Sequence, residues 1–136
     1  MTAVVRVLLV DDEPDFLTLT ARRLQRRGLV VETATCAQEA MERLATGGIQ
    51  VVVLDVQMPG LDGHRAFRTI RARFPSVECI ILTGHGTVID AFELSKSGLF
   101  DYLQKPCDID QLNDKIRQAC QYLLVRDGDD GPGELA

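Results

Sequence analysis

The run of residues 51–54 (VVVL), followed directly by Asp55, limits the possible folds more than any other stretch of this sequence. Four consecutive apolar residues, three of them β-branched, predict a strand buried on both faces, as in the centre of a parallel sheet. Residues 56–60 (VQMPG) cannot continue a strand or a helix, so Asp55 is expected at the strand's carboxyl end. Ligands bind at this edge of open α/β sheets, although a polar residue that merely ends a strand is also ordinary.

The composition is that of a single globular domain. The 136 residues are 46% hydrophobic and 26% charged, and a chain of this size forms a core without disulfides or metals. No run of about eighteen apolar residues marks a membrane span, and residues 1–10 lack the basic region of a signal peptide. Four scattered cysteines without a C-x-x-C pair favour reduced thiols. A cytoplasmic location is therefore expected.

Apolar runs alternate with helical periodicity along the whole chain. Strands are expected at residues 4–10, 29–33, 51–54, 77–82 and 100–103, with helices that begin near residues 14, 37, 66, 88 and 109. Because short loops join alternating strands and helices, the strands must be parallel and connected by right-handed crossovers. The predicted fold is α/β: a doubly wound, five-stranded parallel sheet of order 2-1-3-4-5, flavodoxin-like, with helices on both faces.

One domain without internal repeats is expected over residues 1–125. Residues 126–136 are rich in glycine and aspartate and show no periodicity, which predicts a flexible tail or the start of a linker.

Polar residues follow four of the five predicted strands. Asp11 and Asp12 follow the first, Asp55 the third, Thr83 the fourth and Lys105 the fifth. In a sheet of the predicted order these strand ends are neighbours, and carboxylates in contact there repel by roughly 1–4 kcal/mol per pair. Lys105 offers one compensating charge. A hard divalent ion, Mg²⁺ or Mn²⁺, offers two more.

A carboxylate, a divalent ion, an ammonium and a hydroxyl are the groups needed to receive a phosphoryl group. Asp55 would act as the nucleophile and form an acyl phosphate. The metal and Lys105 would neutralise charge on the phosphoryl oxygens, and Thr83 can donate a hydrogen bond to one of them. Gly84 and Gly86 leave room beside the site.

Four motifs in this order and spacing resemble the receiver domain of bacterial two-component response regulators. They are LLVDDEP (8–14), VVLDVQMPGLDG (52–63), ILTGHG (81–86) and DYLQKPCDID (101–110). Each motif alone is weak, but the four together are highly specific and span residues 4 to 125. The GHG sequence and the FDYLQKP run are similar to receivers of the nitrogen-regulatory type.

The resemblance implies a role for each residue of the predicted site. Asp55 is the residue phosphorylated from the phosphohistidine of a sensor histidine kinase or a phosphotransfer protein. Asp12 ligates Mg²⁺ directly, with Asp11 beside it, often through water, and Asp55 is a metal ligand as well. Gln57 supplies a backbone carbonyl to the metal, and Lys105 contacts the phosphoryl group.

The resemblance also implies a switch. Thr83 is the switch hydroxyl and Tyr102 the switch aromatic residue, and the Lys105–Pro106 bond is expected to be cis. Gly84, His85 and Pro106 are expected next to the phosphoryl group. His85 and Gln57 both border the phosphoryl group, at positions that tune how fast the acyl phosphate is hydrolysed.

The predicted function is a phosphoacceptor signalling domain that catalyses only its own phosphoryl transfer and dephosphorylation. Its fourth helix, fifth strand and fifth helix would contact an output domain or protein, or a second copy of the chain. With a net charge of −5 neither nucleic acid nor membrane is expected as a partner, and the arginines within 22–27 and 65–73 are expected on solvated helix faces.

Two alternatives stay open. One is an aspartyl-phosphate-type, Mg²⁺-dependent phosphohydrolase, which normally carries a second acid where Gln57 stands. The other is a phosphate-independent binding module on the same fold.

Overall fold

The computed structural model describes residues 4–56, 63–84 and 96–129, with side chains up to Leu123. Its elements are β1 (Arg6–Val10), α1 (Pro14–Gln25), β2 (Val30–Ala34), α2 (Ala37–Ala45), β3 (Val51–Leu54), α3 (Gly63–Arg73), β4 (Glu78–Thr83), β5 (Asp101–Gln104) and α5 (Ile109–Asp129). The predicted fourth helix falls mostly within residues 85–95, outside the described residues. No described helix is both long and apolar enough to cross a membrane.

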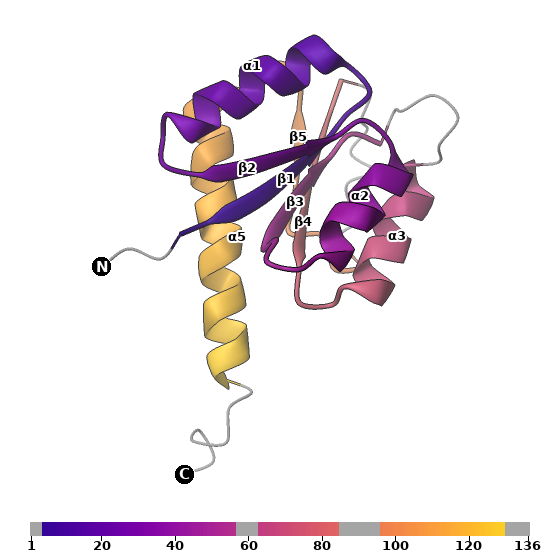
Figure 1. Cartoon of the computed structure of the whole chain (residues 1–136). Coiled ribbons are helices and arrows are strands. Elements are labelled where there is room, and N and C mark those ends of the chain that lie inside the picture. The colour runs from indigo at the N-terminus through magenta and orange to yellow at the C-terminus, as the bar shows by residue number, and fades with distance from the viewer. Residues whose placement is uncertain (1–3, 57–62, 85–95, 130–136) are drawn as a thin grey trace.

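The five strands form one parallel sheet in the order β2-β1-β3-β4-β5, which confirms the predicted topology. Successive residues of β1, β3 and β4 point alternately to the two faces of the sheet, and both faces are covered. In β3, for example, Val51 and Val53 pack with α1 and α5, whereas Val52 and Leu54 pack with α2 and α3. Figure 1 shows these two helix pairs on opposite sides of the sheet. Full burial of each such side chain contributes about 1.5–3 kcal/mol.

Proline and glycine residues explain where α1 begins and ends and where α3 begins. α1 begins at Pro14, whose missing amide hydrogen costs nothing in the first turn. Just beyond α1, Gly28 has a φ of +92°, a conformation that glycine adopts without strain. α3 begins at Gly63, three residues before the predicted start. A Cβ on Gly63 would collide with the backbone of Val56, so the helix can pack there only with glycine.

α5 runs to Asp129, beyond the boundary expected at residue 125. Apolar periodicity reports only the turns that pack on the core. A helix whose backbone hydrogen bonds are intact can continue past the turns that pack on the core, and the backbone of α5 continues past the buried Leu123. The division into a domain and a tail stays a prediction.

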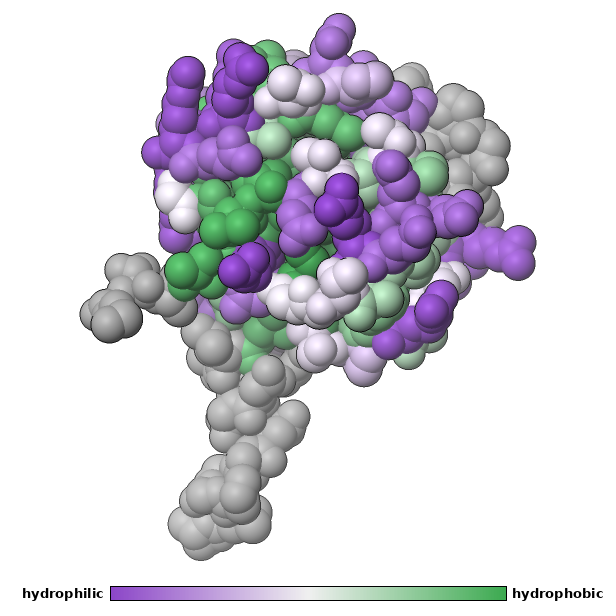
Figure 2. Space-filling view, in the orientation of Figure 1, coloured by the Kyte–Doolittle hydropathy of each residue, from purple (hydrophilic) through white to green (hydrophobic). Residues whose placement is uncertain are grey.

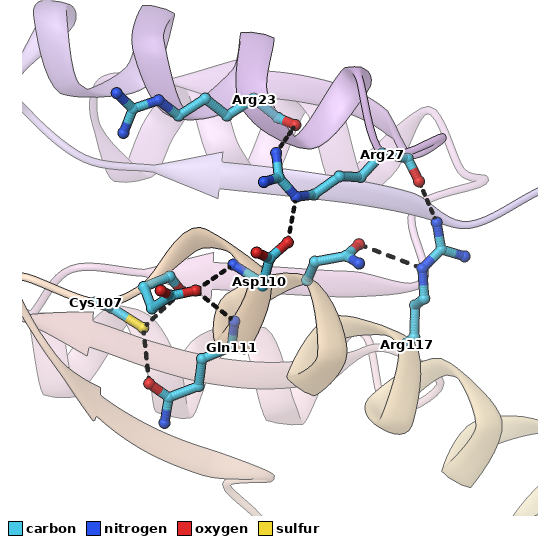
Figure 3. Close-up of polar contacts among 8 residues, drawn as sticks. Arg23, Arg27, Cys107, Asp110, Gln111 and Arg117 are labelled. Carbon is cyan, nitrogen blue, oxygen red and sulfur yellow. Dashed lines mark hydrogen bonds and ion pairs between the residues drawn. The ribbon is translucent and has the colours of Figure 1, made fainter.

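Polar contacts join the end of α1 to α5 (Figure 3). Arg27 donates to Asp110 at 2.7 Å and to the Arg23 carbonyl at 2.9 Å. Arg117 donates to the Arg27 carbonyl at 2.5 Å and to Asn113 at 3.2 Å. Arg27 is therefore half-buried rather than on a solvated face as expected.

Arg71 departs from the same expectation. It is half-buried, donates to the Val77 carbonyl at 2.5 Å, and lies 3.6 Å from the buried carboxylate of Glu78. Helical periodicity assigns an arginine to a face of its helix, but not to a partner that its long side chain reaches on another element.

The face of the molecule drawn in Figure 2 is largely polar over α1 and α2. Apolar surface gathers at the end of β2 nearest the N-terminus (Figure 2), where Val4 and Val30 are exposed. The start of edge strand β2, with the residues just before β1 beside it, is thus one apolar part of this face.

Candidate functional site

The backbone brings the predicted site residues to one edge of the sheet. The ladder hydrogen bonds continue one residue past the strands: the Asp11 amide donates to the Ala34 carbonyl at 3.1 Å and the Asp55 amide to the Val10 carbonyl at 3.0 Å. The Lys105 amide donates to the Thr83 carbonyl at 2.9 Å. Because the strands are parallel and in register, these residues all lie at the carboxyl edge.

Lys105 bridges the two buried carboxylates of this edge. Its Nζ donates to Asp11 Oδ2 at 2.6 Å and to Asp55 Oδ2 at 3.2 Å. Asp11 and Asp55 are only 2% and 5% exposed. Buried carboxylates are costly unless they are paired with positive charge and hydrogen-bonded, so the ammonium of Lys105 is the main compensating group among the described residues.

Glu13 is a member of the cluster that the sequence did not single out. Its Oε1 lies 3.3 Å from Lys105 Nζ, and its backbone amide donates to Asp11 Oδ1 at 2.9 Å. The second contact fixes the orientation of the Asp11 carboxylate. The available sequence signal was the position of Glu13 directly after the two aspartates.

Both partners in the shortest ion pair, Asp11 and Lys105, have raised pKa values, for different reasons. Burial raises the pKa of Asp11 above its usual value of 3.8, although hydrogen bonds from Lys105 and the Glu13 amide act to lower it. Burial acts to lower the pKa of Lys105, but the hydrogen bond and charge of Asp11, followed by those of Asp55, outweigh it, and the pKa lies above 10.5. Lys105 is therefore charged at neutral pH.

Four carboxylates could share a cation here. Oxygens of Asp11, Asp12, Glu13 and Asp55 all lie within 4.8 Å of one another. Asp12 is partly and Glu13 well exposed, so an ion can enter from solvent. These four carboxylates carry more negative charge than the ammonium of Lys105 can balance. Their hard oxygen atoms are the ligands that a divalent cation such as Mg²⁺ prefers.

Thr83 and Tyr102 lie along the same face of the sheet. Thr83 ends β4 and is fully buried. Tyr102 of β5 is paired with Ile81, two residues before Thr83, and packs against the core cluster of α2 and α3, with its hydroxyl oxygen buried. The Lys105–Pro106 bond is cis, as expected. Gly84 is exposed.

Two predicted site residues, Gln57 and His85, lie outside the described residues, and their roles stay predictions.

A family model described as "Response regulator receiver domain" matches residues 7–117. The chain belongs to this receiver domain family. The assignment confirms the resemblance found in the sequence, and the domain is a regulatory phosphoacceptor module rather than an enzyme in the usual sense.

Individual relatives agree with the assignment. An NtrX-like response regulator from Rickettsia bellii is 33% identical over 126 residues, which cover 91% of this chain and 26% of the relative. The C4-dicarboxylate transport transcriptional regulatory protein DctD from Rhizobium meliloti is 34% identical over 119 residues, 88% of this chain and 26% of DctD. The receiver therefore spans about a quarter of the length of these relatives.

A solved structure agrees as well. The crystal structure of a response regulator receiver domain protein from Clostridium thermocellum superposes with a TM-score of 0.83 at 32% identity, covering 90% of this chain and 98% of that chain.

Proposed function

We propose that this receiver domain accepts a phosphoryl group on Asp55 in a Mg²⁺-dependent reaction. The observation that carries the proposal is the contact of Lys105 with both buried carboxylates, at 2.6 Å to Asp11 and 3.2 Å to Asp55. Asp55 is thereby held beside a cation and next to acids that can bind a metal. A cation close to the carboxylate is what an incoming, negatively charged phosphoryl group requires.

The transfer needs few groups. A carboxylate oxygen of Asp55 attacks the phosphorus of a phosphohistidine; the new O–P bond forms as the N–P bond breaks, and the imidazole nitrogen keeps the electron pair and takes up a proton. Lys105 neutralises charge on a phosphoryl oxygen, and Thr83 donates its hydroxyl hydrogen to another. Asp11, Asp12, Asp55 and the Gln57 carbonyl would hold Mg²⁺, which when bound neutralises further phosphoryl charge. Water later hydrolyses the acyl phosphate.

The partners follow from this chemistry. The donor is a sensor histidine kinase or a phosphotransfer protein, and the reaction takes place in the cytoplasm. Once Thr83 turns toward the phosphoryl group, Tyr102 turns inward behind it, and the surface formed by the fourth helix, β5 and α5 changes its population of states. This surface contacts an output domain or protein, or a second copy of the chain, and the domain itself binds neither nucleic acid nor membrane.

Intact mass after incubation with Mg²⁺ and a small acyl-phosphate donor tests the proposal. The wild type should gain one phosphoryl group, and Asp55→Asn or an excess of EDTA should abolish the gain. Glu32→Gln is the matched control, because it removes a carboxylate from edge strand β2 and should leave the gain unchanged. If the wild type neither gains a phosphoryl group nor binds beryllofluoride, the domain is a phosphate-independent binding module.

A further inference from the structure

Among the residues that the structure describes, Lys105 also has a neighbour at the site that is not an acid. Its Nζ lies over the ring of Phe16, 4.1 Å from the ring centroid, in addition to its contacts with the carboxylates of Asp11, Glu13 and Asp55. A cation within about 6 Å of an aromatic centroid is attracted by the negative face of the ring.

The core fixes the Phe16 ring in place. Phe16 is in the first turn of α1, is half-buried, and packs against the core cluster shared by α1 and α5. The ring also lines a small hollow together with Asp11, Asp55, Val53 and Leu82. It is therefore a wall of the phosphorylation site that stays in place when charged side chains rearrange.

A divalent cation competes with Lys105 for its carboxylate partners but not for its aromatic partner. An ammonium has three N–H donors, and here three carboxylates and one ring surround it. Mg²⁺ binds carboxylate oxygens and water, and it has no such preference for a hydrocarbon ring. When the acids turn to a metal or Asp55 becomes phosphorylated, the contact with Phe16 is the one that neither event removes.

We propose that Phe16 is a positioning residue for Lys105. Its ring holds the ammonium beside Asp55 while the carboxylate partners of Lys105 are taken by the metal and the phosphoryl group. The inference rests on the function proposed above, and it deepens that function by adding an aromatic residue to the machinery of phosphoryl transfer.

The contact itself can be measured without any phosphorylation. In the wild type the ring current of Phe16 should shift the Hε resonances of Lys105 upfield, and Lys105→Met identifies those resonances by their loss. Phe16→Tyr should keep the shift, and Phe16→Leu should remove it. Phe74→Leu is the matched control: Phe74 is also half-buried and also lies near a cation, Arg73 at 5.6 Å. Lys105 resonances that do not respond to Phe16→Leu would overturn the proposal.

Phosphorylation kinetics test the consequence. Phe16→Leu should slow Asp55 phosphorylation by about 3- to 10-fold, whereas Phe16→Tyr should stay within about 2-fold of the wild type. In a Lys105→Met background Phe16→Leu should have no further effect, because a positioning residue acts through the group that it positions. Equal effects in both backgrounds would show a merely structural role and overturn the proposal.

The outcomes separate the two proposals. Normal phosphorylation of the wild type without a ring-current shift overturns the role of Phe16 alone. Failure of the wild type to be phosphorylated or to bind beryllofluoride overturns the proposed function, and the role of Phe16 with it. Thermal melting of each variant checks that the fold is retained, and Phe16→Tyr keeps the comparison informative if Phe16→Leu unfolds.

Discussion

Replacement of Lys105 by methionine should lower the stability of the fold, because its ammonium compensates the buried carboxylates of the site. The substitution keeps most of the apolar stem and removes the ammonium, which lies 2.6 Å from Asp11 and 3.2 Å from Asp55. All three side chains are largely buried, with relative exposures of 16%, 3% and 6%. Lys105→Met therefore leaves two buried carboxylates without their principal cation.

The expected loss of stability is large. Removing one partner of a buried ion pair costs about 3–5 kcal/mol, and we take the lower limit, about 3 kcal/mol, because Asp12 and Glu13 open the cluster to solvent. For a domain of this size that corresponds to a fall in Tm of roughly 10 °C. The control is Lys115→Met, which removes a partly exposed ion pair with Asp101 and should cost less than about 1 kcal/mol.

The stability of Lys105→Met relative to the wild type should increase as the pH falls below 7. The pKa of Asp11 in the folded protein is raised above 3.8, chiefly by burial, and it should rise further once Lys105 no longer opposes the shift. The folded state then binds more protons than the unfolded state, so the variant gains stability relative to the wild type as pH falls from 7 through the pKa of Asp11. Lys105 itself has a raised pKa, and its contribution is fully present at pH 7 and lost only above pH 10.5.

Urea denaturation followed by circular dichroism measures these effects, with EDTA at pH 7, with EDTA at acid pH, and with excess Mg²⁺ at pH 7. The difference in unfolding free energy between the wild type and Lys105→Met should be smaller at acid pH. Mg²⁺ should raise the unfolding free energy of Lys105→Met by about 2–3 kcal/mol once its concentration is about 100 times its dissociation constant for the variant, and that of the wild type by less, because Lys105 already holds the same carboxylates. A difference in unfolding free energy below about 1 kcal/mol in EDTA, or one that neither acid nor Mg²⁺ makes smaller, would show that Lys105 is not the principal cation of these carboxylates.

Two further predictions concern residues away from Lys105. Burial raises the pKa of the Cys79 thiol to about 12, so in the native protein iodoacetamide should label Cys79 at least about 100-fold more slowly than the exposed Cys36; comparable labelling of the two peptides by mass would contradict the structure. Gly63→Ala should cost about 2–3 kcal/mol in urea denaturation, because the added Cβ collides with the Val56 backbone. A loss within about 0.5 kcal/mol of zero would show that α3 can move away from Val56 freely.

The sequence was sufficient to predict the sheet and the gathering of the acids and the lysine. Strand ends in a parallel sheet meet at one edge, so the position of a residue just after its strand determines where it lies. Asp11, Asp55 and Lys105 directly follow their strands and Thr83 is the last residue of β4, and none of their positions depends on the details of a side-chain conformation.

The sequence did not predict which partners a long side chain contacts on another element. Glu13 and Phe16 come to Lys105 because of where α1 begins and how its first turn faces the edge of the sheet. Arg27 and Arg71 reach partners on other elements, which periodicity along one helix does not encode. The roles of Gln57 and His85, and the boundary near residue 125, stay predictions.

Identifying the phosphorylated residue tests most directly whether Asp55 is the phosphoacceptor. Borohydride reduces an aspartyl phosphate to homoserine, and peptide mass spectrometry after phosphorylation in Mg²⁺ then locates the converted residue. We predict homoserine at position 55 alone, and none in Asp55→Asn. Homoserine at position 11 or 12, or an unconverted Asp55 in protein that carries a phosphoryl group, would contradict the assignment of Asp55 as the phosphoacceptor.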